Sequence, residues 1–250
     1  MQLELDKAVR QSVDPQAVRN RRSIIAERLL RESDSIDKAD FQRIERRDLF
    51  ELFVQYDDQF LDHGLSRHFE QGSDRLGFRL SSRMTSTGGM TTWRALPDYH
   101  DYEIAVSTTL LFNTPFDRGA TRVGGVVATS RLDALQRIFE HELVHLLEMI
   151  LWGESSCAQP RFRNMVARMF GHTESNHQLL TPAETARSHF GIRTGDRVRF
   201  QHEGQWLTGY VNAINRRATV LVPNAGGELF DDERRYLRFY VPLDLLTTDR

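Results

Sequence analysis

The sequence predicts an α+β protein, in which helices and a small antiparallel sheet form one domain and a small β-barrel follows. Two patterns support this fold class. Apolar residues recur at helical spacing in the segments 40–65 and 130–152. Short segments that alternate apolar and polar residues lie between 76 and 107 and again after residue 193. With 250 residues the chain has room for one large domain or two smaller ones.

The composition excludes several classes of protein. The 33 basic residues nearly balance the 35 acidic ones, so no overall charge favours nucleic acid or an anionic membrane. Cys157 is the only cysteine, which rules out an internal disulfide and suits a reducing compartment. The first residues lack the basic start and apolar core of a signal peptide, and no apolar run reaches membrane-spanning length. We therefore expect a cytoplasmic protein with no membrane partner.

Residues 1–40 are predicted to form a strongly charged helical segment with a thin apolar stripe. This segment is either a solvated helix face or a contact for nucleic acid or a protein partner. A second helix, rich in aromatic residues, is expected within 40–65, where it fits a core position. The arginines that make one side of the first segment basic are Arg19, Arg21, Arg22, Arg28 and Arg31.

Three β-like segments follow at 76–84, 91–94 and 102–107, with a glycine-containing turn at 86–90. They predict a small, largely antiparallel sheet that precedes the next helix. The exposed edge of such a sheet is able to bind an extended peptide by strand addition. We therefore expect this edge to lie near the functional site.

The helix predicted at 130–152 carries the strongest functional signal, the His-Glu-x-x-His motif at 141–145. Its two histidines, His141 and His145, lie on the same helix face about one turn apart, which suits two imidazole nitrogens that bind one Zn²⁺ ion. Glu142 is the candidate catalytic residue, since it is placed to act on water as a general base. Ser130 is the expected N-cap, and Gly153 is expected to end the helix.

The third metal ligand is open between two main candidates. If a further helix, predicted at 161–170, packs antiparallel to the preceding one, its C-terminal end lies level with His141, and His172 is then the first candidate. Cys157 is the competitor, because a thiolate binds zinc well and the turn that contains it could fold back to the metal. The weaker candidates are Glu174 and His177.

The remainder of the chain changes character. Residues 181–192 are predicted to be a linker, and residues 193–250 contain four or five short strands separated by Gly and Asn turns. This spacing predicts a small SH3-like barrel. Acidic residues between 228 and 233 argue against a simple basic face, so the barrel either binds a partner or is purely structural. The candidate contacts for a peptide or nucleic acid are Trp206, Tyr210, Arg216, Arg217, Arg234 and Arg235.

Part of the chain resembles the SprT-like family of zinc metalloproteases. The likeness covers roughly residues 45–180, and it is carried by the segments 52–57, 82–89 and 102–107 together with the motif at 141–145. The resemblance implies a zincin-like metalloprotease domain at 41–180 in which the two histidines of the motif bind zinc and Glu142 is the catalytic acid/base. Some members of the family cleave proteins crosslinked to DNA, so DNA-associated proteins are candidate substrates and DNA is a candidate partner.

The chain departs from the family at the third ligand. The family commonly places its third histidine in a His-Gly-x-x-Phe pattern at the start of the following helix. Phe162 matches the phenylalanine, but Ala158 stands at the position of the histidine, with Cys157 beside it. The third position is therefore filled by His172 or by Cys157, or else the site is weakened.

These observations predict a zinc-dependent metallopeptidase, a hydrolase that cleaves peptide bonds in protein substrates. The alternative is a non-catalytic scaffold, stabilised by zinc, that binds nucleic acid or protein. A closed site with four protein ligands would favour the scaffold, because structural zinc sites leave no open position. The sequence carries no signal for an oligomeric state.

Overall fold

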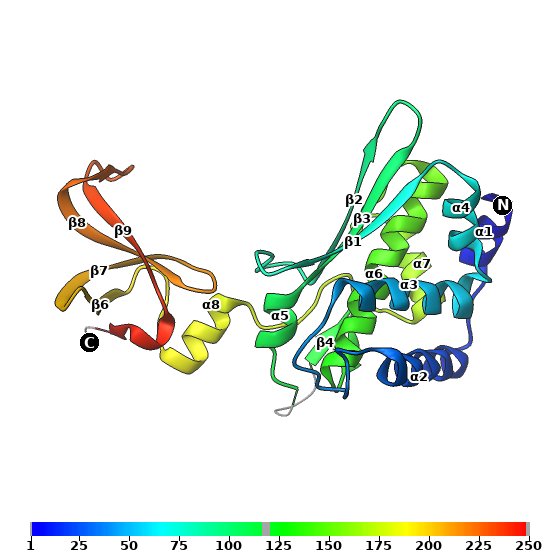
Figure 1. Cartoon of the computed structure of the whole chain (residues 1–250), viewed down its shortest axis with the longest axis horizontal. Helices are drawn as coiled ribbons and strands as arrows, with labels where there is room; N and C mark the ends of the chain where they lie inside the picture. The colour runs from blue at the N-terminus through cyan, green and yellow to red at the C-terminus, as the bar shows by residue number, and fades with distance from the viewer. Residues whose placement is uncertain (1, 117–120, 249–250) are drawn as a thin grey trace. The chain divides into compact units, whose positions relative to one another are not determined.

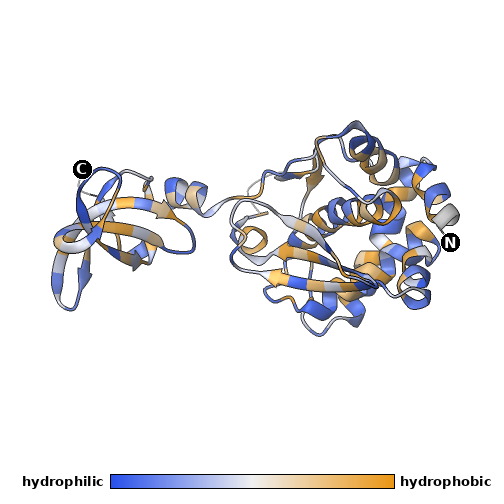
Figure 2. Cartoon of the chain, turned by 90° about the horizontal axis from the view of Figure 1, so that it is seen from above, coloured by the Kyte–Doolittle hydropathy of each residue, from blue (hydrophilic) through white to orange (hydrophobic). Residues whose placement is uncertain are grey.

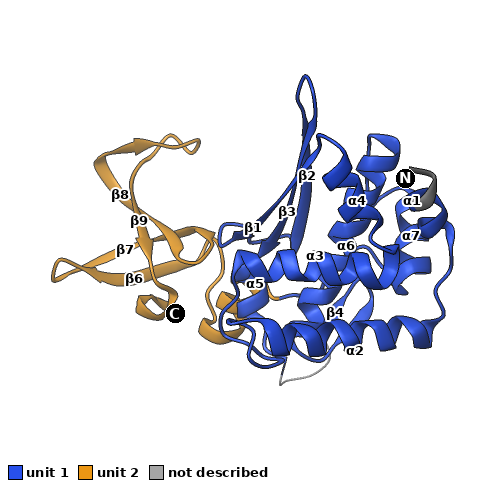
Figure 3. Ribbon diagram, turned by 45° about the vertical axis from the view of Figure 1, so that its right-hand side comes forward, with its two compact units in different colours: residues 1–179 blue, residues 180–250 orange. Residues whose placement is uncertain are grey.

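The computed structural model describes residues 2–116 and 121–248 and shows a mixed α+β protein. The chain divides into two units, residues 1–179 and residues 180–250 (Figure 3). The predicted boundary near residue 180 therefore has a counterpart in the structure. The predicted boundary at residue 40 has none, because the N-terminal helices pack within the first unit. Met1 and residues 249–250, which the predicted domains include, lie outside the described residues.

Four helices precede the sheet of the first unit. They are α1 (Gln2–Arg10), α2 (Pro15–Glu32), α3 (Arg46–Leu61) and α4 (Gly64–Gln71). Helix α2 begins with Asp14 as N-cap and Pro15 in the first turn, an arrangement that suits a helix start. Its inward face buries Val18, Arg22, Ile25 and Leu29. The segment expected to be a solvated helix face or a contact for a partner thus also contributes to the core of the first unit.

A three-stranded sheet lies along the motif helix α6 (Arg131–Trp152), as Figure 1 shows. Its strands are β1 (Arg75–Ser81), β2 (Gly89–Ala95) and β3 (His100–Ser107), in the order β1-β3-β2. Strand β3 pairs antiparallel with β2 but parallel with β1, so the expectation of a largely antiparallel sheet holds for one of the two pairings. Within the described residues β2 pairs on one side only, which leaves its other edge open.

The sheet leads to α6 through short elements that the sequence did not predict. These are α5 (Thr108–Asn113) and the two-stranded ribbon of β4 (Thr121–Val123) and β5 (Val126–Ala128). The predicted helix ends are confirmed for α6, because Ser130 accepts a hydrogen bond from the Asp133 amide and Gly153 has a left-handed backbone with φ of 71°. Helix α7 (Pro160–Phe170) likewise ends at Gly171, with φ of 70°.

The core of the first unit is built around α6. Apolar side chains on most of its circumference are fully buried against the surrounding helices and the sheet, among them Leu135, Phe139, Leu143, Leu146 and Leu147. Figure 2 shows hydrophobic residues, in orange, on the helices and strands of the chain. Because close-packed side chains on every side hold α6 in place, residues on it have fixed positions.

The second unit is a five-stranded sheet with its own small core. The strand order is β10-β6-β7-β8-β9, and all pairings are antiparallel. Among the described residues no pairing joins the two outer strands, so the closed barrel expected from the sequence is not found. The strands are β6 (Arg197–His202), β7 (Gln205–Ile214), β8 (Ala218–Leu229), β9 (Arg235–Val241) and β10 (Thr247–Thr248).

The expected linker at 181–192 is largely helical. It contains α8 (Pro182–Thr185) and the π-helical turn η1 (Ala186–Phe190), and a short 3-10 turn, η2 (Leu243–Leu245), follows β9. Thr181 and Glu184 form a capping box at the start of α8, and Ile192 joins the core of the sheet. This segment therefore belongs to the second unit. No helix among the described residues has the length and apolar character needed to cross a membrane.

Candidate metal centre

The histidines of the motif are presented by a rigid helix. His141 and His145 are half-buried on α6, while the intervening Leu143 and Val144 are fully buried in the core. The two Nε2 atoms lie 3.2 Å apart. Two nitrogens bound to one tetrahedral zinc ion at 2.0–2.1 Å would be separated by about 3.3 Å, so this spacing fits a shared ion.

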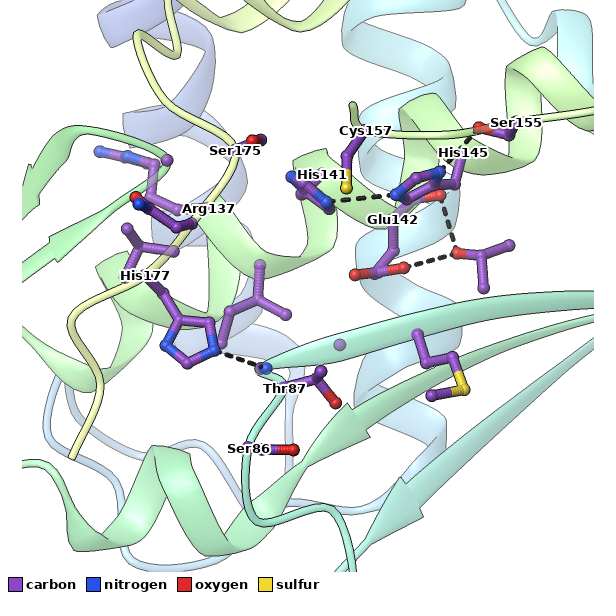
Figure 4. Close-up of a pocket in the computed structure, with 18 of the residues that line it drawn as sticks. Ser86, Thr87, Arg137, His141, Glu142, His145, Ser155, Cys157, Ser175 and His177 are labelled. Carbon is purple, nitrogen blue, oxygen red and sulfur yellow. Dashed lines mark hydrogen bonds between the residues drawn. The ribbon is translucent and has the colours of Figure 1, made fainter. Parts of the chain in front are cut away.

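Cys157 completes a group of three donors with the two histidines. Its Sγ and the two imidazole nitrogens all lie within 4.8 Å of one another, and no other such group of His, Cys, Asp or Glu donors is found among the described residues. The cysteine lies in the turn between α6 and α7, which folds back over the motif (Figure 4). A His-His-Cys set is chemically suited to zinc, since imidazole and thiolate are its common ligands.

The structure does not bring His172, the first of the two main candidates for the third ligand, to this group, and brings Cys157 instead. The ring of His172 is buried, and its Nε2 lies 2.8 Å from Oε2 of Glu140. Equal helical rise predicts that His172 lies at the level of His141 along α6. His172 instead contacts Glu140, the residue before His141. Because successive residues of a helix point about 100° apart, His172 reaches a different face of α6 from the one that carries the motif histidines. The weaker candidates, Glu174 and His177, are not in the group either.

Ser155 fixes the tautomer of His145. Its Oγ lies 2.7 Å from Nδ1 of His145 and donates a 2.6 Å hydrogen bond to Oε2 of Glu148. The Ser155 hydroxyl has one proton and donates it to Glu148. Its oxygen must therefore accept a hydrogen bond from Nδ1–H of His145, which leaves a free lone pair on Nε2 of His145. Arg161 of α7 holds the buried Glu148 in turn, with an N–O distance of 2.7 Å. Such partners orient a metal-binding imidazole.

The surroundings of the histidines keep both of them neutral. Burial and, to a smaller extent, the neighbouring imidazoles lower the pKa of His141 to about 3, and burial lowers the pKa of His145 to about 4. The ring of Phe162 packs against both imidazoles, with ring centroids 4.8 Å and 4.3 Å away. Neutral imidazoles are the form that binds a metal, so the unprotonated site is ready for one.

Glu142 is held between α6 and the sheet. The Thr91 hydroxyl on β2 lies 2.8 Å from Oε2 of Glu142 and 3.0 Å from its main-chain oxygen. Gly89 makes room for the carboxyl group, because a Cβ at this position would lie 2.5 Å from Oε1. Burial raises the pKa of Glu142 to about 8, although the hydrogen bonds from Thr91 act in the opposite direction. A carboxyl group with such a pKa is suited to exchange protons near neutral pH.

The three donors and Glu142 open into one cavity of about 490 Å³. Its floor is α6, and one wall is the segment 86–91, which includes the start of the open edge strand β2. Figure 4 shows His145, Ser155 and Cys157 toward one end of the cavity, and Arg137 and His177 toward the other. The donor group thus borders a space that is large enough for part of a peptide.

Sequence reasoning missed several residues of the site. Thr91, Ser155 and Arg137 line the cavity, but a Thr in a strand, a Ser in a turn and an Arg on a helix carry no spacing signal of their own. Arg137 alone could have been noticed, since it precedes His141 by four residues and therefore shares its helix face.

Comparisons of the chain with protein-family models, with curated proteins and with solved structures found no match.

Proposed function

We propose that this protein is a zinc-dependent peptidase of the SprT-like, zincin type, in which His141, His145 and Cys157 hold the metal and Glu142 is the general base. The observation that carries the proposal is the group of three donors formed by the two motif histidines and Cys157, with Nε2 atoms 3.2 Å apart, next to the buried carboxyl group of Glu142. Three ligands and an adjoining cavity are typical of a catalytic zinc site, whereas structural sites have four protein ligands.

The residues of the cavity have defined tasks in this reaction. When bound, zinc supplies Lewis-acid chemistry, in that it acidifies water and polarises a carbonyl group. Glu142 takes a proton from the attacking water and delivers it to the nitrogen of the leaving amine. The hydroxyl of Thr91 holds the carboxyl group in position, and the absence of a side chain at Gly89 leaves room for it. We propose that the second unit is a variant of the SH3-like barrel.

The open edge of β2 is the proposed place of the substrate backbone. This edge begins in the wall of the cavity and pairs with no other strand among the described residues. An extended peptide that adds to it gains main-chain hydrogen bonds and runs past Glu142. A substrate that is already unfolded or extended is therefore favoured over a compact domain.

The decisive experiment compares Glu142→Gln with the wild type, both loaded with zinc, on a denatured casein substrate. We expect the variant to retain one zinc ion per chain and to lose at least about a thousandfold in hydrolysis rate, since general acid–base catalysis contributes 10²–10⁴-fold. Glu154→Gln, which changes an exposed glutamate near the same site, is the control and should keep full activity. An active Glu142→Gln protein would refute the proposed role.

A second candidate function, binding of single-stranded nucleic acid, is supported by the surface of the second unit. Trp206 is 55% exposed, and the guanidinium of Arg199 lies 5.2 Å from its ring centroid. Tyr210 is exposed four residues further along β7, on the same face of the strand. Exposed aromatic rings beside arginines are suited to stack on bases.

This second function is tested by titrating the full-length protein with a fluorescent single-stranded oligonucleotide at 50 and 200 mM salt. We expect binding that weakens with salt and that Trp206→Ala reduces about tenfold, since stacking contributes roughly 1–3 kcal/mol per base. Trp93→Ala, at an exposed tryptophan of the first unit, should bind as the wild type does. Equal binding by both variants would contradict the assignment.

A further inference from the structure

Arg137 is a buried cation in the wall of the cavity. It lies on α6 one turn before His141, only 7% of its surface is exposed, and its Nε and Nη1 have no hydrogen-bond partner among the described residues. Its one ion pair is weak, with 3.8 Å between Nη2 and Oδ1 of Asp133. A guanidinium is always charged and carries five N–H donors, so leaving it buried and unpaired is costly.

The nearby carboxylate of Glu140 does not serve as a hydrogen-bond partner for Arg137. The charge of Arg137 helps to lower the pKa of Glu140, but both carboxylate oxygens are already engaged. Arg22 binds them at 2.6 Å each, while Tyr56 and His172 lie within 2.9 Å and 2.8 Å of them. No hydrogen bond joins Arg137 to this carboxylate. The Nε and Nη1 donors of Arg137 are therefore left without a partner among the described residues, in a side chain that lines the cavity.

The end of the cavity near Arg137 is suited to an anion. Among the lining residues Glu142 is the only acidic one, and it is held farther along the cavity beside Thr91. The lining also includes Ser175 and Asn176, which are polar and uncharged. An arginine in such a setting binds a carboxylate through charge-assisted hydrogen bonds, which are stronger than those between neutral groups.

Helix geometry gives the distance of this anion from the reacting bond. Arg137 precedes His141 by four residues, which is about 6 Å along the helix axis. One residue of an extended peptide spans about 3.3 Å. A carboxylate held by Arg137 therefore belongs to a residue about one or two positions away from the scissile peptide bond.

The direction of β2 indicates on which side of the bond the anion lies. A Cβ on Gly88 would be 3.3 Å from Ile138, and the following residues Gly89 and Thr91 contact Glu142, so β2 runs in the same direction as α6. A substrate strand paired antiparallel to β2, the slightly more stable pairing, runs the opposite way. Its C-terminal part then points toward Arg137.

We propose that Arg137 binds a substrate carboxylate one or two residues to the C-terminal side of the scissile bond. This inference rests on the proposed peptidase function and adds its substrate class, which is an extended peptide with a negative charge just after the cleavage point. Two sources supply that charge, namely the free C-terminus of a chain or the side chain of an Asp or Glu residue within it.

The test measures binding rather than turnover. Zinc-loaded, full-length Glu142→Gln protein is titrated by calorimetry with three peptides: acetyl-tetraalanine with a free carboxylate, the same peptide as an amide, and an amidated peptide with Glu at the last position. We expect the free acid, the Glu peptide or both to bind at least about tenfold more tightly than the neutral amide, as a charge-assisted hydrogen bond provides. The free acid identifies the terminal carboxylate as the source, and the Glu peptide identifies a side chain.

The same titrations are repeated with Arg137→Met and Arg137→Lys in the Glu142→Gln protein. Methionine should remove the preference for the charged peptides, while lysine keeps the charge and should retain part of it. Arg79→Met, which removes an exposed arginine on β1, is the control for net charge and should change nothing. Thermal unfolding and zinc content show whether each variant is folded.

Two results would overturn the inference. One is equal affinity of the Glu142→Gln protein for charged and neutral peptides, a comparison that needs no Arg137 variant. The other is an unchanged preference in a folded Arg137→Met protein. Neither result touches the proposed function, because casein hydrolysis by the wild type and its loss in Glu142→Gln are measured separately. Absence of binding by every peptide would also reject the carboxylate subsite.

Discussion

The guanidinium of Arg22 and the carboxylate of Glu140 form a two-fold hydrogen-bonded ion pair, with both N–O distances 2.6 Å, between residues 118 positions apart in the chain. This pair joins α2 to α6 directly before His141. It is fully enclosed, and Tyr56 and His172 complete the hydrogen bonds of the carboxylate. Helix α2 therefore contributes to the frame that carries the candidate metal centre.

Replacement of Arg22 by methionine should destabilise the first unit strongly. The substitution leaves the Glu140 carboxylate buried without its main partner, and breaking such pairs costs about 3–5 kcal/mol. Urea unfolding of Arg22→Met measures this loss. Arg19→Met, at an exposed position of the same helix, is the control and should differ from the wild type by less than about 0.5 kcal/mol. A similar small effect for Arg22→Met would contradict a stabilising role for the pair.

The Glu140 network should make stability depend on pH in the acid range. Burial alone would raise the pKa of Glu140, but the charge of Arg22 and the hydrogen bond from His172 lower it well below its ordinary value. A carboxyl group whose folded pKa is depressed adds stability above its unfolded pKa, about 4.3, and this contribution is lost as the pH falls toward the folded value. Burial also lowers the pKa of His172, so protons bind preferentially to the unfolded state below about pH 6.5.

Both groups therefore act in the same direction, and the free energy of unfolding should fall steadily between pH 7 and pH 3. Urea unfolding at several pH values measures the slope. Glu140→Gln should be less stable at pH 7 and should show a shallower slope below pH 5 than the wild type. Identical slopes in the two proteins would show that Glu140 does not titrate differently in the folded and unfolded states.

Cys157 and His172 should differ in their effect on zinc. Cys157→Ala removes one of three donors and should lower zinc affinity at least about a hundredfold, measured by competition with a chelator. His172→Ala should lower stability, because it removes a partner of the buried Glu140, but it should leave zinc affinity within a few fold of the wild type. The reverse outcome would restore His172 as the third ligand.

Local sequence patterns determine the ends of a helix in this chain, but not which helix faces and strands pack together. The course of α6 follows from its own residues, with Ser130 and Gly153 at its ends and His141 and His145 one turn apart. The faces of packed helices do not follow from counting residues, and for this reason His172 was expected at the metal but lies at Glu140. The parallel pairing of β1 with β3 and the burial of Arg22 depend on contacts between distant segments, which no local spacing encodes.

Gly89→Ala should impair catalysis without loss of metal. The new Cβ would lie 2.5 Å from Oε1 of Glu142, so the carboxyl group must move away from its position beside Thr91. We expect kcat to fall about a hundredfold or more while zinc content stays at one ion per chain. Gly77→Ala on β1 is the matched control, since its Cβ would meet no atom closer than 3.8 Å and activity should be unchanged. Full activity of the Gly89 variant would show that the position of Glu142 tolerates displacement.

Ser155→Ala should weaken metal binding through His145 rather than through a lost ligand. The hydroxyl links Nδ1 of His145 to Glu148, and its removal leaves the imidazole free to rotate and to adopt the tautomer with the proton on Nε2. We expect zinc affinity to fall about 10–100-fold, as measured by chelator competition, with little change in the free energy of unfolding of the zinc-free protein. Ser156→Ala, at the exposed neighbouring serine, should bind zinc as the wild type does. If both serine variants bind zinc equally well, the orientation of His145 is set by its packing on Phe162 and not by the hydrogen bond.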